Sequence, residues 1–262
     1  MLEFRLLGTL EVLYNGAAVR IPRGKPQAIL VILLIRGGKP VSTERLIDML
    51  WADRPPTTAR QAFYTHMAHL RRSFTNAGIE DPVQKRAGEG YLIETEHRQL
   101  DTIRFGELAA RGRAAAARER LQDAWEGLDQ ASALWRDDEP LSGVQCPAVT
   151  DDEVAPLRLA RIAARQDWCD VGLRLGRHRE VLTVLRRLYK DDPLRERTQE
   201  LLLIAEYQDG GQARGLDVFE DIRRRLLEEA GLDPSDRLWW LQKQILLREP
   251  ALSLMRQPSE VF

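Results

Sequence analysis

The sequence predicts an α+β N-terminal winged helix, with a small antiparallel sheet, three helices and a β-hairpin wing, followed by an all-α tetratricopeptide-like repeat domain. Three observations support this fold class. The first 22 residues alternate between apolar and polar positions, as half-buried strands do. Three helical patterns and a second hairpin pattern follow. From Phe105 onward strand patterns stop and an internal repeat begins.

The N-terminal strands are predicted by apolar residues at alternate positions, among them Phe4, Leu6, Leu10, Val12, Tyr14, Val19 and Ile21. Asn15-Gly16 separates two of these runs. The favoured two-residue hairpin turn needs positive φ at both positions, which Asn and Gly tolerate. A small antiparallel sheet therefore opens the chain.

Two short helices are expected next. Pro26 suits a first helical turn, and the helix 27–36 ends at Gly37-Gly38. Ser42 is expected to cap a second helix, and the segment 51–56 to form a loop. Thr57 or Thr58 should cap a third helix that runs to about Asn76.

The third helix has one apolar and one polar face. Phe63, Met67, Leu70 and Phe74 recur at spacings of four, three and four, which defines a single buried stripe. The opposite face carries Gln61, Thr65, Ala68, His69 and Arg72, with Arg60, Tyr64, His66 and Arg71 on the flanks. The segment 57–76 contains no acidic residue, so the outer face should be positive.

A second hairpin follows Gly78. The segment 83–86 leads into Gly88-Glu89-Gly90, and the segment 91–93 returns. Lys85 and Arg86 are expected at the tip of this hairpin, together with two glycines. The order of three helices and a basic hairpin is that of a winged helix.

The rest of the chain is predicted to be helical, over residues 105–117, 119–135, 151–175, 178–190, 194–209, 212–230 and 235–248. Gly176 to Gly210 and Leu182 to Leu216 are each 34 residues apart, the period of tetratricopeptide helix pairs. The predicted domains are 1–104 (winged helix) and 105–250 (helical repeats), with a C-terminal tail at 251–262.

The charge distribution supports this division. The whole chain has a net charge of −1, but residues 1–104 contain 15 Lys/Arg and 11 Asp/Glu (net +4), whereas residues 105–262 contain 24 and 29 (net −5). Such asymmetry is typical of a basic nucleic-acid-binding module joined to an acidic partner domain. No apolar run is long enough to span a membrane, and no secretory signal is evident, so we expect a cytoplasmic, nucleoid-associated protein.

The sequence contains little that indicates a catalytic, metal-binding or nucleotide-binding site. His66 and His69 have a helical metal-ligand spacing, but no Cys, Asp or Glu in their helix completes a shell. Gly24-Lys25 lacks the rest of a phosphate-binding loop. The acidic clusters 137–139 and 151–153 are more typical of loops or helix starts than of a calcium site. We therefore expect no metal, no cofactor and no enzymatic activity. Helix packing is expected for Trp125, Trp135, Trp168, Trp239 and Trp240, with a protein contact surface as the alternative for Trp239 and Trp240.

The third helix is interpreted as a recognition helix in the DNA major groove, where amides, hydroxyls and guanidinium groups read base edges. Gln61, Thr65 and Arg72 are the expected base-reading residues, with a phosphate contact as the alternative for Arg72. Arg60, Arg71 and the helix N-terminus are the expected phosphate contacts. Lys85 and Arg86 would reach phosphates or the minor groove. An ordinary solvated basic helix is the alternative for this segment alone. For the whole chain, the alternative is a helical-repeat adaptor that binds peptides.

The chain resembles the Streptomyces antibiotic regulatory protein (SARP) family. The likeness is carried by residues 4–8, 26–27, 46–51, 55–60, 69–72 and 90–92 in the first domain, and by 133–136, 176–180, 193–197 and 228–234 in the second. The resemblance implies an OmpR/PhoB-type winged helix, as in two-component phosphorelay regulators, followed by a bacterial transcriptional activation domain. It implies an activator of antibiotic or other secondary-metabolite biosynthesis that binds direct repeats near the −35 element as side-by-side protomers.

The resemblance also implies contact with RNA polymerase holoenzyme, including its σ factor, which recruits the polymerase. The loop before the recognition helix is then the expected polymerase contact, formed by Trp51, Ala52, Asp53, Arg54, Pro55 and Pro56. The expected DNA-binding residues are Thr58, Arg60, Gln61, Tyr64, Thr65, His66, His69, Arg71, Arg72, Lys85 and Arg86.

Overall fold

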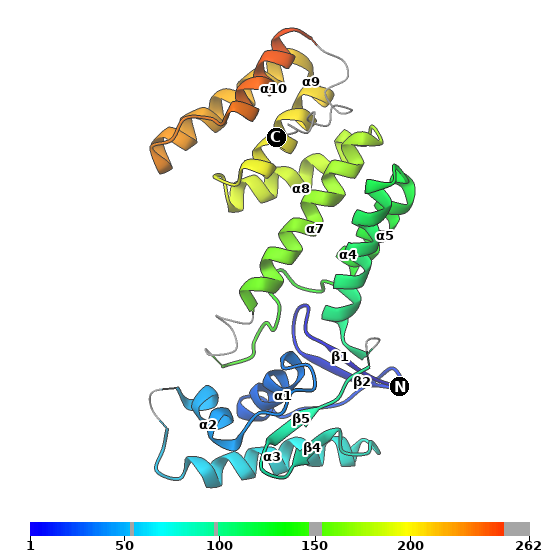
Figure 1. Cartoon of the computed structure of the whole chain (residues 1–262), viewed down its shortest axis with the longest axis vertical. Coiled ribbons are helices and arrows are strands. Elements are labelled where there is room, and N and C mark those ends of the chain that lie inside the picture. The colour runs from blue at the N-terminus through cyan, green and yellow to red at the C-terminus, as the bar shows by residue number, and fades with distance from the viewer. Residues whose placement is uncertain (53–54, 97–98, 147–153, 249–262) are drawn as a thin grey trace. The chain divides into compact units, whose positions relative to one another are not determined.

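The computed structural model describes residues 1–52, 55–96, 99–146 and 154–248 of the 262-residue chain (Figure 1). Packing divides the chain into two compact units. Unit 1 comprises Met1–Glu107 and Ala131–Arg161, and unit 2 comprises Leu108–Gln130 and Ile162–Phe262. Along the described stretches, no helix combines the length and apolar character needed to cross a membrane.

The predicted N-terminal sheet is confirmed. Strands β1 (Leu2–Arg5), β2 (Glu11–Tyr14) and β3 (Ala17–Ala18) form an antiparallel sheet in that order. Phe4 pairs with Val12, and Leu13 pairs with Ala18. The turn between β2 and β3 has φ of 51° at Asn15 and 82° at Gly16, as the Asn-Gly pair predicts.

Three helices pack beside this sheet. Helix α1 (Lys25–Ile35) has Pro26 in its first turn and is followed by Gly37 and Gly38, both at positive φ. Its apolar residues are almost all buried, so it lies in the centre of the unit. Helix α2 (Thr43–Trp51) is capped by Ser42, whose hydroxyl accepts a hydrogen bond from the Arg45 N–H at 3.2 Å. Because Trp51 is the last residue of α2, the following loop starts at Ala52, one residue later than expected.

Helix α3 (Ala59–Asn76) and a two-stranded hairpin complete the winged helix. Thr58 stands at the N-cap of α3 but makes no capping hydrogen bond, so the expected cap there is wrong. Its backbone angles (φ −97°, ψ 18°) are not the extended ones that let a cap side chain reach back. Strands β4 (Val83–Arg86) and β5 (Gly90–Ile93) form the hairpin (Figure 1).

The described residues of the later segment, 131–146 and 154–161, add to the core of unit 1. Leu141, Val144 and Cys146 are each at most 6 % exposed and belong to the same hydrophobic cluster as Phe63 and Phe74. The boundary predicted at residue 104 follows a change in sequence pattern, whereas the packing also joins this later segment to the N-terminal unit.

The described helices after the wing are α4 (Asp101–Ala117), α5 (Leu121–Ala133), α7 (Val154–Arg174), α8 (His178–Asp191), α9 (Glu196–Arg225), the π-helical turn η2 (Leu226–Ala230) and α10 (Asp236–Leu246). Two helices were expected over 194–209 and 212–230. The span of α9 contains these two helical segments, which meet at a kink at Gly211, where φ of 73° and ψ of −165° are not helical. The expected break between two helices is therefore confirmed at this position. In unit 2, α8 and α10 each pack on α9, and Leu185, Phe219 and Leu241 belong to their shared hydrophobic cluster (Figure 1). The tail 251–262 lies outside the described residues.

Candidate nucleic-acid interface

Helix α3 presents one buried and one exposed face. Phe63, Met67, Leu70 and Phe74 are at most 3 % exposed. This apolar stripe fixes the rotation of the helix about its axis. The predicted outer residues are consequently all exposed: Gln61, Thr65, Ala68, His69 and Arg72. Amide, hydroxyl, imidazole and guanidinium groups thus follow one another along about three turns of the same face.

The flanking residues of α3 differ in how freely they face solvent. Tyr64 is exposed, and so is Arg60, whose guanidinium lies 2.9 Å from the carboxylate of Glu44. His66 is half-buried, and its ring lies 6.3 Å from that of Trp51. Burial lowers the pKa of His66, and the charges of His69 and Lys25 lower it further. A neutral imidazole can still donate or accept a hydrogen bond, but it cannot neutralise a phosphate.

Arg71 holds the wing against α3. Its guanidinium lies 3.0 Å from the Asp81 carboxylate, donates a hydrogen bond to the Val83 carbonyl at 2.9 Å, and stands 5.8 Å from the centre of the Tyr91 ring. These partners all lie at or inside the hairpin. The sequence indicated a basic flank at this position but not the wing contact, because the partners lie up to 20 residues away.

The hairpin is also fixed to the start of α2. The Val41 and Tyr91 backbones exchange two hydrogen bonds, of 2.8 and 2.9 Å. Gly90 passes so close to Val41 that a Cβ there would lie 2.0 Å from the Val41 carbonyl oxygen. The wing is therefore a supported element of unit 1.

Lys85 and Arg86 were expected at the hairpin tip, but they lie on strand β4 before it, since the turn itself is formed by the segment 87–89. Lys85 is exposed, and its ammonium lies 5.8 Å from the centre of the Tyr91 ring. Arg86 is exposed and lies 3.0 Å from the Glu94 carboxylate. Such an exposed ion pair is weak, so Arg86 can turn to an external anion.

The loop before α3 is exposed where the structure describes it. Trp51 is half-buried, with the Lys25 ammonium 5.3 Å from the centre of its ring. Lys25 also donates a hydrogen bond to the Leu50 carbonyl. Ala52, Pro55 and Pro56 are exposed, and Ala52 has a positive φ of 48°. Asp53 and Arg54 lie outside the described residues.

Metal-binding clusters are absent from the part of the chain that the structure describes. Within the described ranges, no three His, Cys, Asp or Glu side chains are arranged to hold a metal ion. The rings of His66 and His69 lie 6.5 Å apart without an acidic neighbour on their helix. The chemistry available here is hydrogen bonding and neutralisation of an anionic surface.

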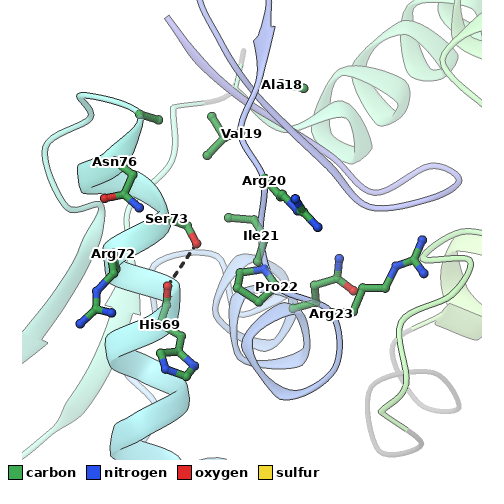
Figure 2. Close-up of a pocket in the computed structure, with 12 residues that line it drawn as sticks. Ala18, Val19, Arg20, Ile21, Pro22, Arg23, His69, Arg72, Ser73 and Asn76 are labelled. Atoms are coloured by element: carbon green, nitrogen blue, oxygen red, sulfur yellow. Dashed lines mark hydrogen bonds between the residues drawn. The ribbon is translucent and has the colours of Figure 1, made fainter.

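Sequence reasoning overlooked two arginines beside α3. Arg20 and Arg23 follow β3 and line an open groove together with His69, Arg72, Ser73 and Asn76 (Figure 2). They lie outside the helix and the hairpin that the winged-helix pattern singled out. In the sequence they appear only as two arginines three residues apart, in a segment that also contains Pro22 and Gly24.

Comparison with known proteins places the chain in a family. Residues 100–246, more than half of the chain, match the bacterial transcriptional activator domain, and residues 23–93 match the C-terminal domain of transcriptional regulatory proteins. Regulatory protein DnrI of Streptomyces peucetius is 31 % identical over 257 residues, which cover 96 % of this chain and 94 % of DnrI. The chain belongs to the SARP family of transcriptional regulators.

Other SARP relatives are longer. Regulatory protein AfsR of Streptomyces griseus is 35 % identical over 255 residues, which cover 96 % of this chain but only 25 % of AfsR. A solved structure of Mycobacterium tuberculosis EmbR, in complex with a low-affinity phosphopeptide, superimposes with a TM-score of 0.88 and 27 % identity. That match covers 95 % of this chain and 66 % of EmbR. The predicted fold class, a winged helix followed by a helical domain, is thereby confirmed.

Proposed function

We propose that this SARP-family chain binds duplex DNA sequence-specifically through the outer face of α3 and activates transcription from that position. One observation carries the proposal: an exposed helix face with base-reading side chains and no carboxylate, on a helix whose rotation is fixed by a fully buried stripe. A major groove about 12 Å wide admits one such helix.

The residues divide by role. Gln61 and Arg72 carry the bidentate groups that pair with adenine and guanine edges, and Thr65 offers a hydroxyl and a methyl group. Arg60, Lys85 and Arg86 supply phosphate contacts, with Thr58, Tyr64, His66 and His69 as nearby polar groups. Arg71 is expected to act first by holding the wing, because its guanidinium is already engaged there.

A salt series with the full chain tests DNA binding. We expect the wild type to select a set of duplexes from genomic fragments, with affinity falling by a log–log slope of about 0.9 per phosphate contacted. Gln61→Ala and Arg72→Ala should each reduce the preference for selected over random duplex by about 1–3 kcal/mol. The matched control is Arg104→Ala, which removes an exposed arginine of α4. Equal binding of selected and random duplex by the wild type would exclude sequence-specific recognition.

Activation is proposed to proceed through RNA polymerase holoenzyme and its σ factor. Side-by-side protomers on direct repeats near the −35 element would present the loop of residues 51–56. The described, exposed part of this loop includes the rigid pair Pro55-Pro56. Replacing both prolines with serine should lower transcription in a purified polymerase assay without lowering promoter affinity. Transcription that falls only in proportion to DNA binding would argue against a polymerase contact here.

The biological role proposed from family membership is control of antibiotic or other secondary-metabolite genes in the cytoplasm, at the nucleoid. Genes adjacent to the selected fragments identify the pathway. Recovered sites with two copies of a motif in the same orientation would support side-by-side binding, and their spacing would give the number of protomers.

A further inference from the structure

The structure contains a groove of about 1250 Å³ beside α3, on the side that the wing does not occupy. Its first wall is the segment from Ala18, the last residue of β3, to Arg23, just before α1. Its second wall is the C-terminal half of α3, from His69 to Ala77. Figure 2 shows this segment alongside α3, with the Val19 and Ile21 side chains directed toward the helix.

The groove is cationic and has a small apolar floor. Its twelve lining residues include three arginines and one histidine, but no Asp or Glu. Val19 and Ile21 are each 8 % exposed and contribute apolar surface. Arg72 extends from α3 in the direction away from the segment, whereas Arg20 and Arg23 extend from the side of the segment that faces away from α3 (Figure 2). An occupant would therefore meet positive charge at both edges and apolar groups between them.

These arginines differ from the other arginines of the interface. Arg60, Arg71 and Arg86 each lie within 3.0 Å of a carboxylate of unit 1. Among the residues that the structure describes, Arg20, Arg23 and Arg72 have no carboxylate within ion-pair distance and are exposed. A guanidinium without an internal partner can bind phosphate oxygens without first breaking an ion pair.

The position of the groove relative to the wing indicates what passes through it. A helix inserted in the major groove lies between the two phosphate backbones that border that groove. On one side of α3, Arg71 fixes the hairpin that carries Lys85 and Arg86. The groove lies on the other side, where the second backbone would run. A sugar-phosphate strand matches its surface, since it combines apolar sugars with one negative charge per nucleotide.

We propose that Arg20 and Arg23 bind the phosphate backbone of the DNA strand opposite the wing, so that the duplex is held on both sides of α3. This inference rests on the proposed DNA binding and adds a contact that the winged-helix pattern does not identify. Because these arginines would contact phosphates and no base edge, they should contribute affinity without sequence preference.

The test uses the full chain and a duplex selected by the wild type. Arg20→Ala/Arg23→Ala should weaken binding by about tenfold per arginine. It should lower the magnitude of the salt slope by about 2 and leave the ranking of duplex sequences unchanged. Arg20→Lys/Arg23→Lys should keep most of the salt slope, because the charges remain. Unchanged thermal unfolding of each variant shows that the fold is intact.

The matched control is Arg104→Ala/Arg118→Ala, which removes two exposed arginines on or directly after α4. The proposal is overturned if the groove variant and the control bind DNA with equal affinity and equal salt slope. It is also overturned if the groove variant keeps its affinity for DNA but loses polymerase binding or self-association. That result would mean that the groove binds an acidic protein surface. A wild type that prefers its selected duplex while the groove variant matches the control refutes this inference alone. A wild type without any duplex preference refutes the proposed function itself.

Discussion

The carboxylate of Asp101 lies 3.2 Å from the guanidinium of Arg136, 35 residues later in the chain. The same carboxylate accepts backbone hydrogen bonds from Leu6, at 2.8 and 2.9 Å, and from Leu7, at 3.0 Å. The Asp101 side chain is only 4 % exposed. One buried charge thus connects the N-terminal sheet, the start of α4 and the segment after α5 within unit 1.

Arg136→Ala should destabilise unit 1 by about 2–3 kcal/mol at neutral pH, because it leaves a buried carboxylate with less compensation. Burial raises the pKa of Asp101, against the hydrogen bonds from Leu6 and Leu7 and the charge of Arg136. Removal of Arg136 should raise this pKa further. The stability that a raised carboxyl pKa contributes is present below the unfolded value and is lost as pH rises through the folded value.

The loss of unfolding free energy caused by Arg136→Ala should therefore grow from about pH 4 to pH 7. Urea unfolding at several pH values measures it. Arg60→Ala is the control, because its partner Glu44 is as exposed as Arg60 itself, and it should change stability little at any pH. A deficit for Arg136→Ala that is the same at pH 4 and pH 7 would contradict the role given to the Asp101 charge.

The elements that the sequence predicts well are those fixed by neighbouring residues. Asn15-Gly16 specifies its turn, Ser42 its cap, and the spacing of the apolar residues in α3 its buried face. The outer face of the candidate interface follows from that spacing alone. Local pattern is sufficient wherever the physical cause lies within one turn or one strand pair.

Features that depend on distant contacts could not be predicted in this way. No local pattern pairs Asp101 with Leu6, which is 95 residues away, or brings Leu141 and Val144 into the core beneath the sheet and helices. The groove at Arg20 likewise exists only because the segment after β3 lies beside the end of α3. At Thr58 even a local preference fails. Threonine favours the N-cap position, but the backbone angles of Thr58 keep its hydroxyl from making the capping hydrogen bond.

Gly90→Ala should destabilise unit 1 by about 2–4 kcal/mol and weaken DNA binding. Gly90 has φ of 120°, and a Cβ would lie 2.0 Å from the Val41 carbonyl oxygen, so the wing must move away from the start of α2. Gly88→Ala is the matched control in the same hairpin. Gly88 also has positive φ, 76°, but open space around it, so only the conformational cost of about 1 kcal/mol applies. Equal unfolding midpoints for the two variants would refute the close approach.

The two thiols should be unreactive in the folded protein. Cys146 is 1 % exposed and Cys169 is fully buried, and burial raises the pKa of Cys169 to about 12. Since the thiolate is the reactive form, iodoacetamide at about pH 8 should modify neither residue in the native chain and both in urea. Mass spectrometry of the digested protein measures each site separately. Rapid labelling of Cys169 without denaturant would mean that unit 2 opens locally around it.

Glu206 in unit 2 is held by two arginines, and Glu206→Gln should destabilise this unit by about 1–3 kcal/mol. Its carboxylate accepts hydrogen bonds from Arg186, at 2.7 and 3.1 Å, and from Arg214, at 3.0 Å. Burial acts to raise the pKa of Glu206, but these hydrogen bonds and charges outweigh it, and the pKa is lowered. A lowered carboxyl pKa contributes stability that is present above the unfolded value and is lost as pH falls through the folded value. The difference in stability between wild type and Glu206→Gln should therefore be largest near neutral pH and shrink below about pH 4.

Glu220→Gln is the control, because Glu220 is 61 % exposed and pairs with Arg223 at 3.7 Å. If both glutamine variants unfold at the same urea concentration at pH 7, the contacts of Glu206 with Arg186 and Arg214 contribute no more stability than an ordinary surface ion pair.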